Sequence, residues 1–312
     1  MSERIVFHLP GSWLGPFGTG LLPFYDKLLA GLRARGIATA TEVLDRDRLA
    51  ACVAADDAFH IVNHGRMRHP RVLNAGIAYV YPFWHLDPWG IRAFSSIAAV
   101  RFDPAAVDVE AARPFFRRLR KRLVGARTSR YAQPEARAEG LPEGAAAVFL
   151  QSEGHRIVGE TCHLTRWEML EATLAGWDGP VVVKPHPRDN LAETRERLRD
   201  YAARFARLHV STGNIHDILA ACDRVVTINS AVGIEAYLHR KPVILCGQAD
   251  FHHIAQVARR PDELAGFLAA PARRRAYDKY IHWYFAQNCL STTEPALVDR
   301  FLDRVAVGGA AG

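Results

Sequence analysis

The sequence predicts an α/β protein of two domains, each built on a parallel β-sheet that helices cover on both faces. The chain has 312 residues, about twice the usual length of one domain. Hydrophobic residues make up 49% of it and charged residues 23%, the balance of a globular protein with a large core. Short apolar runs alternate with amphipathic stretches, which is the pattern of βα units.

The first half predicts three strands, which are Arg4–Leu9, Ala58–Val62 and Ile77–Tyr81. A turn rich in glycine and proline follows the first strand, and a helix over 21–32 follows the turn. The second half is more regular. Its predicted strands are 181–184, 208–211, 225–228 and 242–246, and its predicted helices are 165–175, 191–205, 215–222 and 232–238. One further strand, 145–150, is predicted at the end of the irregular middle of the chain. We therefore place one Rossmann-like domain at 1–160, a second at 161–285, and a C-terminal helix at 286–312 that packs back on the first domain.

The positive charge is concentrated in one block. Lys and Arg number 40 against 33 Asp and Glu, a net charge of +7. The segment 113–130 holds eight of these cations and no acid, so it carries the whole excess. Nucleic-acid binding is disfavoured, because the excess is confined to one segment and no known nucleic-acid module is present.

The basic block also predicts a helix, over about 108–123. Its apolar residues Phe115, Phe116, Leu119 and Leu123 recur at helical spacing, and Arg117, Arg118, Lys121 and Arg122 surround them. Two interpretations stay open. The helix presents an ordinary solvated face, or it lies on an anionic membrane surface.

Two strand ends in the second half carry candidate ligand-binding groups, because ligands of α/β sheets bind beyond the carboxyl ends of the strands. Lys184, His186 and Pro187 follow the strand 181–184, and the flanking prolines restrict the backbone around the histidine. Asn229, Ser230 and Ala231 follow the strand 225–228 and begin a helix that contains Glu235. A helix N-terminus there offers amide groups to an anion. The alternatives are a proline-rich strand exit and a simple helix cap.

Together these motifs resemble the capsule polysaccharide biosynthesis family, which includes β-Kdo transferases of the GT-B fold. The matching residues are His186-Pro187, Asn229-Ser230, Glu235-Ala236, Lys241-Pro242-Val243-Ile244 and Gly247. The resemblance covers about 145–290. It implies two Rossmann-like domains that face a central cleft, and an inverting glycosyltransferase that uses a CMP-activated sugar without a metal or other cofactor. The one DxD-like triplet, Asp45-Arg46-Asp47, is interpreted as a helix cap rather than a metal site.

The resemblance also implies a catalytic base near a strand end. The family has a Gln followed by an Asp that takes the acceptor proton, and this chain has Gln151 followed by Glu153 and His155. Because His155 occupies the position of the usual Asp, it is the preferred candidate, with Glu153 as the alternative. Loss of transferase activity is the third interpretation.

The acceptor is expected in the first domain. His64 follows the strand Ala58–Val62, and Trp84, His85 and Asp87 follow Ile77–Tyr81. An aromatic ring beside hydrogen-bonding groups suits a sugar, whereas the alternative is a packed core.

The expected partners are a nucleotide-sugar donor and a glycan or lipid-linked acceptor. No signal peptide is recognisable, so we expect a cytoplasmic protein on the inner face of the membrane. A CMP-sialic acid transferase, a CDP-polyol transferase and a non-catalytic nucleotide-binding assembly protein remain as alternatives.

Overall fold

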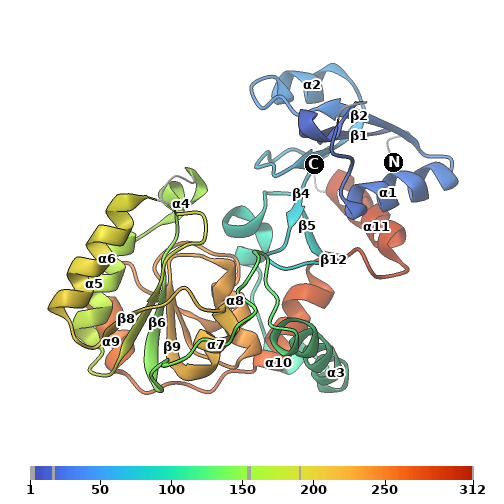
Figure 1. Ribbon diagram of the computed structural model, residues 1–312. Coiled ribbons are helices and arrows are strands. Elements are labelled where there is room, and N and C mark those ends of the chain that lie inside the picture. Colours follow the sequence, from blue (N-terminus) through green and yellow to red (C-terminus); the bar gives the residue numbers. More distant parts are fainter. Residues whose placement is uncertain (1–3, 16–17, 153–155, 190, 311–312) are drawn as a thin grey trace. The chain divides into compact units, whose positions relative to one another are not determined.

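The computed structural model describes residues 4–15, 18–152, 156–189 and 191–310 (Figure 1). The chain divides into two compact units, one made of 1–100 with 284–312 and the other of 101–283. Each unit contains a six-stranded sheet in which parallel pairs predominate. The predicted fold class, an α/β protein of GT-B type with two Rossmann-like units, is therefore confirmed.

The division between the units falls earlier in the chain than the predicted boundary at residue 160. The strand β6 (Ala145–Phe149) is a central strand of the second sheet. The helix α3 (Val109–Arg120) packs against α10 (Tyr277–His282) of the second unit. The last helix, α11 (Leu297–Ala310), packs against α1 (Pro23–Ala34) of the first unit. A local apolar pattern identifies a strand but does not identify the sheet that the strand joins, and this accounts for the difference.

The first sheet has the strand order β12-β5-β4-β3-β1-β2. The strands β1 to β4 are parallel, and β5 runs antiparallel to both of its neighbours. Helices α1 and α11 contribute to the core on one face, and α2 (Leu49–Ala55) packs on a smaller cluster. The strand bounds are β1 Arg4–Leu9, β2 Ala38–Val43, β3 Phe59–Asn63, β4 Val72–Ile77, β5 Phe83–Asp87 and β12 Leu290–Ser291.

The predicted strand Ile77–Tyr81 is wrong. The strand β4 ends at Ile77, and β5 begins at Phe83 after a tight turn in which Tyr79 has a φ of 65°. An unbroken apolar stretch gives no signal for where the chain reverses, so the sequence pattern merged the turn with the strand. The consequence for function is that Trp84, His85 and Asp87 lie within β5 rather than after a strand.

The second sheet is wholly parallel, with the strand order β11-β10-β9-β6-β7-β8. If β6 is counted as strand 1, the order read from β8 to β11 is 3-2-1-4-5-6, as in dinucleotide-binding folds. In such a sheet the chain adds strands first on one side of β6 and then, from β9 on, on the other side. We call the place between β6 and β9 the reversal point. The remaining strand bounds are β7 Val181–Lys184, β8 Leu208–Val210, β9 Cys222–Thr227, β10 Val243–Leu245 and β11 Gln256–Val257.

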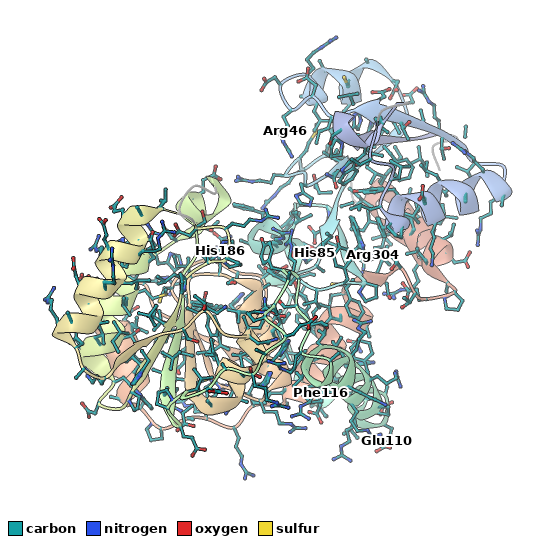
Figure 2. All side chains as sticks on the ribbon, in the orientation of Figure 1. Arg46, His85, Glu110, Phe116, His186 and Arg304 are labelled. Carbon is teal, nitrogen blue, oxygen red and sulfur yellow. The ribbon has the colours of Figure 1, made fainter. Side chains whose placement is uncertain are left out.

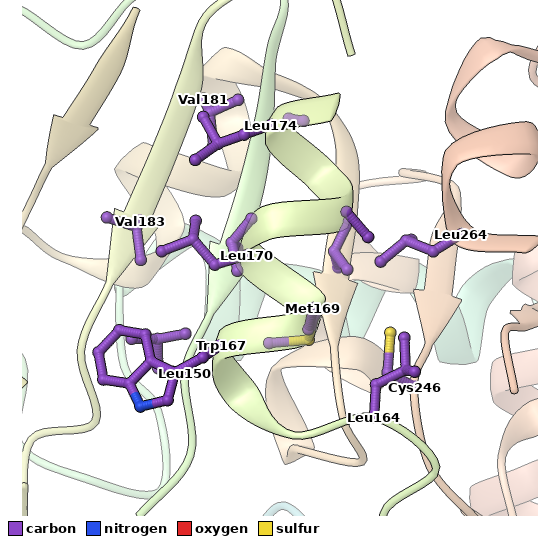
Figure 3. Close-up of a cluster of buried hydrophobic side chains, with 14 of the residues drawn as sticks. Leu150, Leu164, Trp167, Met169, Leu170, Leu174, Val181, Val183, Cys246 and Leu264 are labelled. Carbon is purple, nitrogen blue, oxygen red and sulfur yellow. The ribbon is translucent and has the colours of Figure 1, made fainter. Parts of the chain in front are cut away.

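Helices cover both faces of this sheet. One face carries the main apolar core, in which Trp167, Met169 and Leu170 belong to the same buried cluster as Val181 and Val183 of β7 (Figure 3). Trp167, Met169 and Leu170 belong to helix α5, which begins with a capping box at Thr165. Besides α3 and α10, the helices of the second unit are α4 Arg156–Thr161, α5 Arg166–Gly176, α6 Ala192–Arg204, α7 Ile215–Ala221, α8 Ala231–Leu238 and α9 Pro261–Ala269.

The basic block forms α3 and a following π-helical turn, Lys121–Gly125. Its apolar residues Phe116, Leu119 and Leu123 are buried, and α3 packs against α8 and α10. The apolar side of this helix therefore faces protein, and insertion of that side into lipid is excluded. None of the helices in the described part of the chain combines the length and apolar composition that crossing a bilayer needs.

Candidate functional site

Three predicted motifs meet at the carboxyl edge of the second sheet. The strands β7, β6 and β9 are neighbours in the sheet, and they end next to His186, Gln151 and Ser230 respectively. Because neighbouring strands lie about 4.8 Å apart, segments that are distant in sequence gather within a few strand widths. The edge spans the point where the chain reverses direction across the sheet, which is where such folds bind ligands.

Gln151 and Asn229 form a reciprocal pair across this reversal point. The Gln151 amide nitrogen donates to Asn229 Oδ1 at 2.9 Å, and the Asn229 backbone N–H donates to Gln151 Oε1 at 2.9 Å. The Asn229 amide nitrogen donates to Thr161 Oγ1 at 2.6 Å and to the Gln248 carbonyl at 3.1 Å. Both residues therefore use their side chains to join three loops, and they shape the edge instead of presenting free groups.

A glycine permits one of these loops to pass close by. A Cβ atom at Gly247 would stand 2.8 Å from the Thr161 carbonyl oxygen and 2.7 Å from the Ile228 side chain. These contacts are shorter than side chains allow, so Gly247 of the family motif has a steric role.

Ser230 is the N-cap of α8, as the sequence predicts. Its hydroxyl accepts a hydrogen bond from the Val232 N–H at 3.4 Å, and Ala231 is the first residue of the helix. The first turn of α8 thus points its amide groups toward the carboxyl edge, where the helix dipole favours an anion.

Lys184 is committed to the backbone. Its ammonium group donates to the carbonyl oxygens of Thr212 and Gly213, at 2.9 and 2.6 Å, and only 7% of the residue is exposed. Burial lowers the pKa of this ammonium. Lys184 therefore holds the loop between β8 and α7 at the end of β7, and it adds positive charge beneath the edge.

The turn that carries His186 is held from several directions. The Asp189 N–H donates to the His186 carbonyl at 2.9 Å, and the Arg188 N–H donates to His186 Nδ1 at 3.1 Å. The Asp189 carboxylate forms a buried ion pair with Arg166 of α5. With Pro187 restricting the backbone, these contacts fix the position of the imidazole.

The structure adds Tyr131 to this group, from a segment that the sequence describes only as an irregular connection. Its ring meets the His186 ring edge-on, with centroids 5.3 Å apart, and the Arg188 guanidinium lies 4.9 Å from the Tyr131 centroid. The Asn214 amide donates to the Arg127 and Pro134 carbonyls at 3.1 Å each, which ties the segment to the start of α7.

A pocket of about 960 Å³ opens beside this turn, and we call it the His186 pocket. Its lining includes Gln133, Lys184, His186, Thr194, Arg195 and Arg199. Asp189 is the one carboxylate of the lining, and it is already paired with Arg166. The His186 pocket therefore has an excess of positive charge, which suits a phosphate. Arg195 and Arg199 lie one helical turn apart on α6, a spacing that the sequence contains but that the prediction did not use.

Glu235 is buried on α8, with 2% of the residue exposed. Burial raises the pKa of its carboxyl to about 7, against the opposing effect of a hydrogen bond from Ser129. Among the described residues, Glu235 Oε1 has no hydrogen-bond partner. Glu235, a candidate ligand-binding residue of the sequence motif, is therefore enclosed in this structure.

The two candidate bases, Glu153 and His155, lie outside the described residues. Gln151, the third residue of the predicted catalytic group, is placed at the end of β6. The assignment of the base remains a prediction.

The predicted acceptor residues of β5 are packed in the first unit. Trp84 is 1% exposed and stacks on Phe24 with ring centroids 4.4 Å apart. His85 is fully buried, and burial together with nearby positive charge lowers its pKa to about 3 (Figure 2).

The Asp87 carboxylate accepts hydrogen bonds from the Trp89 and Ser96 N–H groups, at 2.8 and 2.9 Å, and so braces a loop. These positions favour the alternative of a packed core for Trp84, His85 and Asp87. His64 differs from them, because it follows β3 with a φ of 50° and is part-exposed.

The DxD-like triplet forms a turn before α2 instead of the predicted helix cap, since the N-cap of α2 is Arg48 and no side chain caps it. Asp45 Oδ1 accepts hydrogen bonds from the Asp47 and Arg48 N–H groups, at 3.0 and 3.2 Å, just before α2. In the part of the chain that the structure describes, no three His, Cys, Asp or Glu side chains gather as metal ligands would.

The chain thus has two Rossmann-like units, and the second carries a cationic pocket at the carboxyl ends of β7 and β8; this architecture is that of GT-B-like folds. Comparison with solved structures agrees. The chain is similar to two solved structures of KpsC from Thermosulfurimonas dismutans. It matches the β-Kdo 2,4 transferase with a TM-score of 0.54 and 16% identity, covering 90% of this chain and 89% of that one. It matches the β-Kdo 2,7 transferase with a TM-score of 0.53 and 14% identity, covering 96% and 99%.

The family model of capsule polysaccharide biosynthesis proteins matches residues 168–289. The resemblance to that family is therefore confirmed over this part of the chain, which includes His186, Ser230 and Glu235. A comparison with curated proteins finds no match.

Proposed function

We propose that the protein is a metal-independent, inverting glycosyltransferase of surface polysaccharide biosynthesis. It transfers Kdo or a related acid sugar from a CMP-activated donor to a glycan or glycolipid acceptor. The family match and the fold support this proposal. The observation that carries it is the His186 pocket, where an excess of cations lies at the carboxyl ends of β7 and β8 in a sheet with the strand order of dinucleotide-binding folds.

The proposed reaction breaks the bond between the anomeric carbon and a phosphate oxygen of the donor. CMP leaves with the electron pair, while an acceptor hydroxyl attacks the opposite side of the carbon and loses its proton to a base. Developing charge on the phosphate requires fixed cations or amide groups. His186, Arg195 and the first turn of α8 are the groups of this chain that suit that role, and His155 or Glu153 is the proposed base.

Titration calorimetry with CMP and with CMP-Kdo tests the donor site. The His186→Ala variant is expected to weaken CMP binding at least tenfold, because about 1.4 kcal/mol, the magnitude of one charge-assisted hydrogen bond, corresponds to a factor of ten. The matched control is His209→Ala, which removes an exposed histidine of β8 in the same unit. Equal CMP binding by both variants would remove His186 from the donor site.

A turnover assay with a panel of activated donors then separates the alternatives. Transfer from CMP-sialic acid or a CDP-polyol instead of CMP-Kdo would identify one of the other transferases. A non-catalytic assembly protein would bind CMP, turn over no donor, and be unaffected by His155→Ala or Glu153→Gln. For the transferase, the variant of the true base retains CMP binding and loses transfer by a factor of about 10²–10⁴.

The proposed place of action is the cytoplasmic face of the membrane, where a lipid-linked acceptor would be found. Because the apolar side of α3 is buried against protein, the proposed contact between α3 and the membrane is electrostatic.

A further inference from the structure

A second cationic pocket lies on the basic block, and we call it the α3 pocket. It has a volume of about 570 Å³, and its lining includes Phe116, Arg117, Arg120, Lys121, His239 and Arg240. It thus joins the last turn of α3 to the C-terminal end of α8 within the second unit. No carboxylate is present among the lining residues.

The four cations of the α3 pocket are not neutralised by the protein. Within the described ranges, no ion pair joins an Asp or Glu to Arg117, Arg120, Lys121 or Arg240. Four like charges around one pocket repel one another, and they lower the stability of the unit unless an anion binds between them.

Two of these cations are held in place. The Arg120 Nε–H donates to the Leu238 carbonyl at 3.1 Å, at the end of α8. The Arg240 guanidinium lies 5.1 Å from the centre of the buried Phe116 ring. An anion that binds here meets guanidinium groups that are already ordered, so little side-chain entropy is lost on binding.

The charge of the pocket resides in the arginines and the lysine. Burial, together with the neighbouring His216, Arg120 and Lys241, lowers the pKa of His239 to about 3. His239 is therefore neutral at pH 7, and its ring serves as a wall of the pocket.

The α3 pocket is separate from the donor site. Helix α8 begins with its N-cap Ser230 at the carboxyl edge of the sheet, and the α3 pocket lies at its other end, beyond Leu238. Figure 2 shows Phe116 and His186 well apart within the second unit.

The cations also continue beyond the pocket lining, to Arg113. Arg113 is exposed and recurs with the pocket residues Arg117 and Lys121 every four residues, so the three form a row about 12 Å long on the outer side of α3. A single small anion in the pocket would leave Arg113, at the end of this row, without an anionic partner. A plane of anionic headgroups would engage both the pocket and Arg113.

We propose that the α3 pocket binds the headgroup phosphate of an anionic phospholipid, and that the row of cations that extends from it to Arg113 holds the second unit on a membrane surface without insertion of apolar side chains.

Co-sedimentation with lipid vesicles tests this proposal. The protein is expected to bind vesicles that contain phosphatidylglycerol and not vesicles of phosphatidylcholine alone, with affinity that falls as salt rises. The triple variant Arg117→Gln, Lys121→Gln, Arg240→Gln is expected to bind about a hundredfold more weakly, since each cation near an anionic surface contributes a factor of about five.

The matched control, Arg33→Gln, Arg46→Gln, Arg273→Gln, removes the same charge from exposed positions away from the α3 pocket. The control is expected to lose at most a few-fold in vesicle binding, and both variants are expected to bind CMP like the parent chain. Retained CMP binding shows that the triple variant is folded and separates this proposal from the proposed transferase activity.

Two results would overturn the proposal. One is vesicle binding by the triple variant that equals that of the control. The other is displacement from vesicles by millimolar inorganic phosphate, but not by chloride of the same ionic strength, which would make the pocket a site for a soluble anion instead.

Discussion

The carboxyl edge of the second sheet and the strand β5 of the first unit both carry a histidine and other polar residues, but these residues differ in their position relative to the strand end and in their burial. His186 and Ser230 follow two parallel strands, β7 and β9, and the turn that holds His186 borders a cationic pocket. Trp84, His85 and Asp87 lie inside an antiparallel strand, and all three are buried. The difference teaches that position relative to the strand end decides whether a histidine or aromatic residue is available to a ligand, because residues within a covered strand must pack.

Truncation of Trp84 is the most severe test of this comparison. If the ring is a core residue, Trp84→Ala lowers the free energy of unfolding by about 3–5 kcal/mol, through lost burial and the cavity left beside Phe24. Urea denaturation measures the loss. The control Trp89→Ala, which removes a ring that is 37% exposed and has the Arg68 guanidinium over its face, should cost at most about 1 kcal/mol. If Trp84→Ala left the stability unchanged and weakened acceptor binding, Trp84 would belong to the acceptor site and not to the core.

The pH dependence of stability tests the enclosed carboxyl of the second unit. The pKa of Glu235 is raised from 4.5 to about 7, so between these values the folded protein holds a proton that the unfolded chain has lost. The free energy of unfolding should therefore fall as pH rises through this window, by at most ~3 kcal/mol.

The Glu235→Gln variant isolates this contribution, because it cannot ionise. Its stability relative to the parent should rise from about pH 5 to about pH 8, as measured by urea denaturation at each pH. A difference that is the same at both ends of the window would show that Glu235 is solvated in the folded protein.

The pair at the reversal point gives the smallest expected effect. Because Gln151 and Asn229 exchange two hydrogen bonds, a double-mutant cycle with Gln151→Ala and Asn229→Ala should show a coupling energy of about 1–2 kcal/mol in urea denaturation. A second cycle with Gln133→Ala in place of Gln151→Ala should be additive, because Gln133 bonds to Ile215 rather than to Asn229. Additivity in both cycles would mean that Asn229 shapes the edge without Gln151.

The regular part of the second unit could be predicted closely. The strand Val181–Lys184 has the predicted bounds, since β-branched residues favour a strand and Pro185 ends it. The N-cap at Ser230 and the helix after it were predicted for the same local reason. The strand prediction failed at 77–81, which contains only the last residue of β4 and most of the turn that leads to β5.

The site could be predicted only in part. Family motifs identified His186 and Ser230, but nothing local to Tyr131 indicates that its ring meets His186. The burial of Glu235 could not be predicted either. Helix α8 is apolar on most sides, so its sequence does not indicate which elements cover its single carboxyl.

The sequence by itself determined the α/β class, most elements of the second unit, and the segments from which the donor site is proposed. These features depend on residues that are neighbours in the chain, through apolar periodicity, helix caps and proline. Tertiary structure alone decided that β6 belongs to the second sheet, that Trp84 is core, and that the basic helix packs its apolar side on α8 and α10. Each of these depends on contacts between segments distant in sequence, and the energy of such contacts has no local signature in the chain.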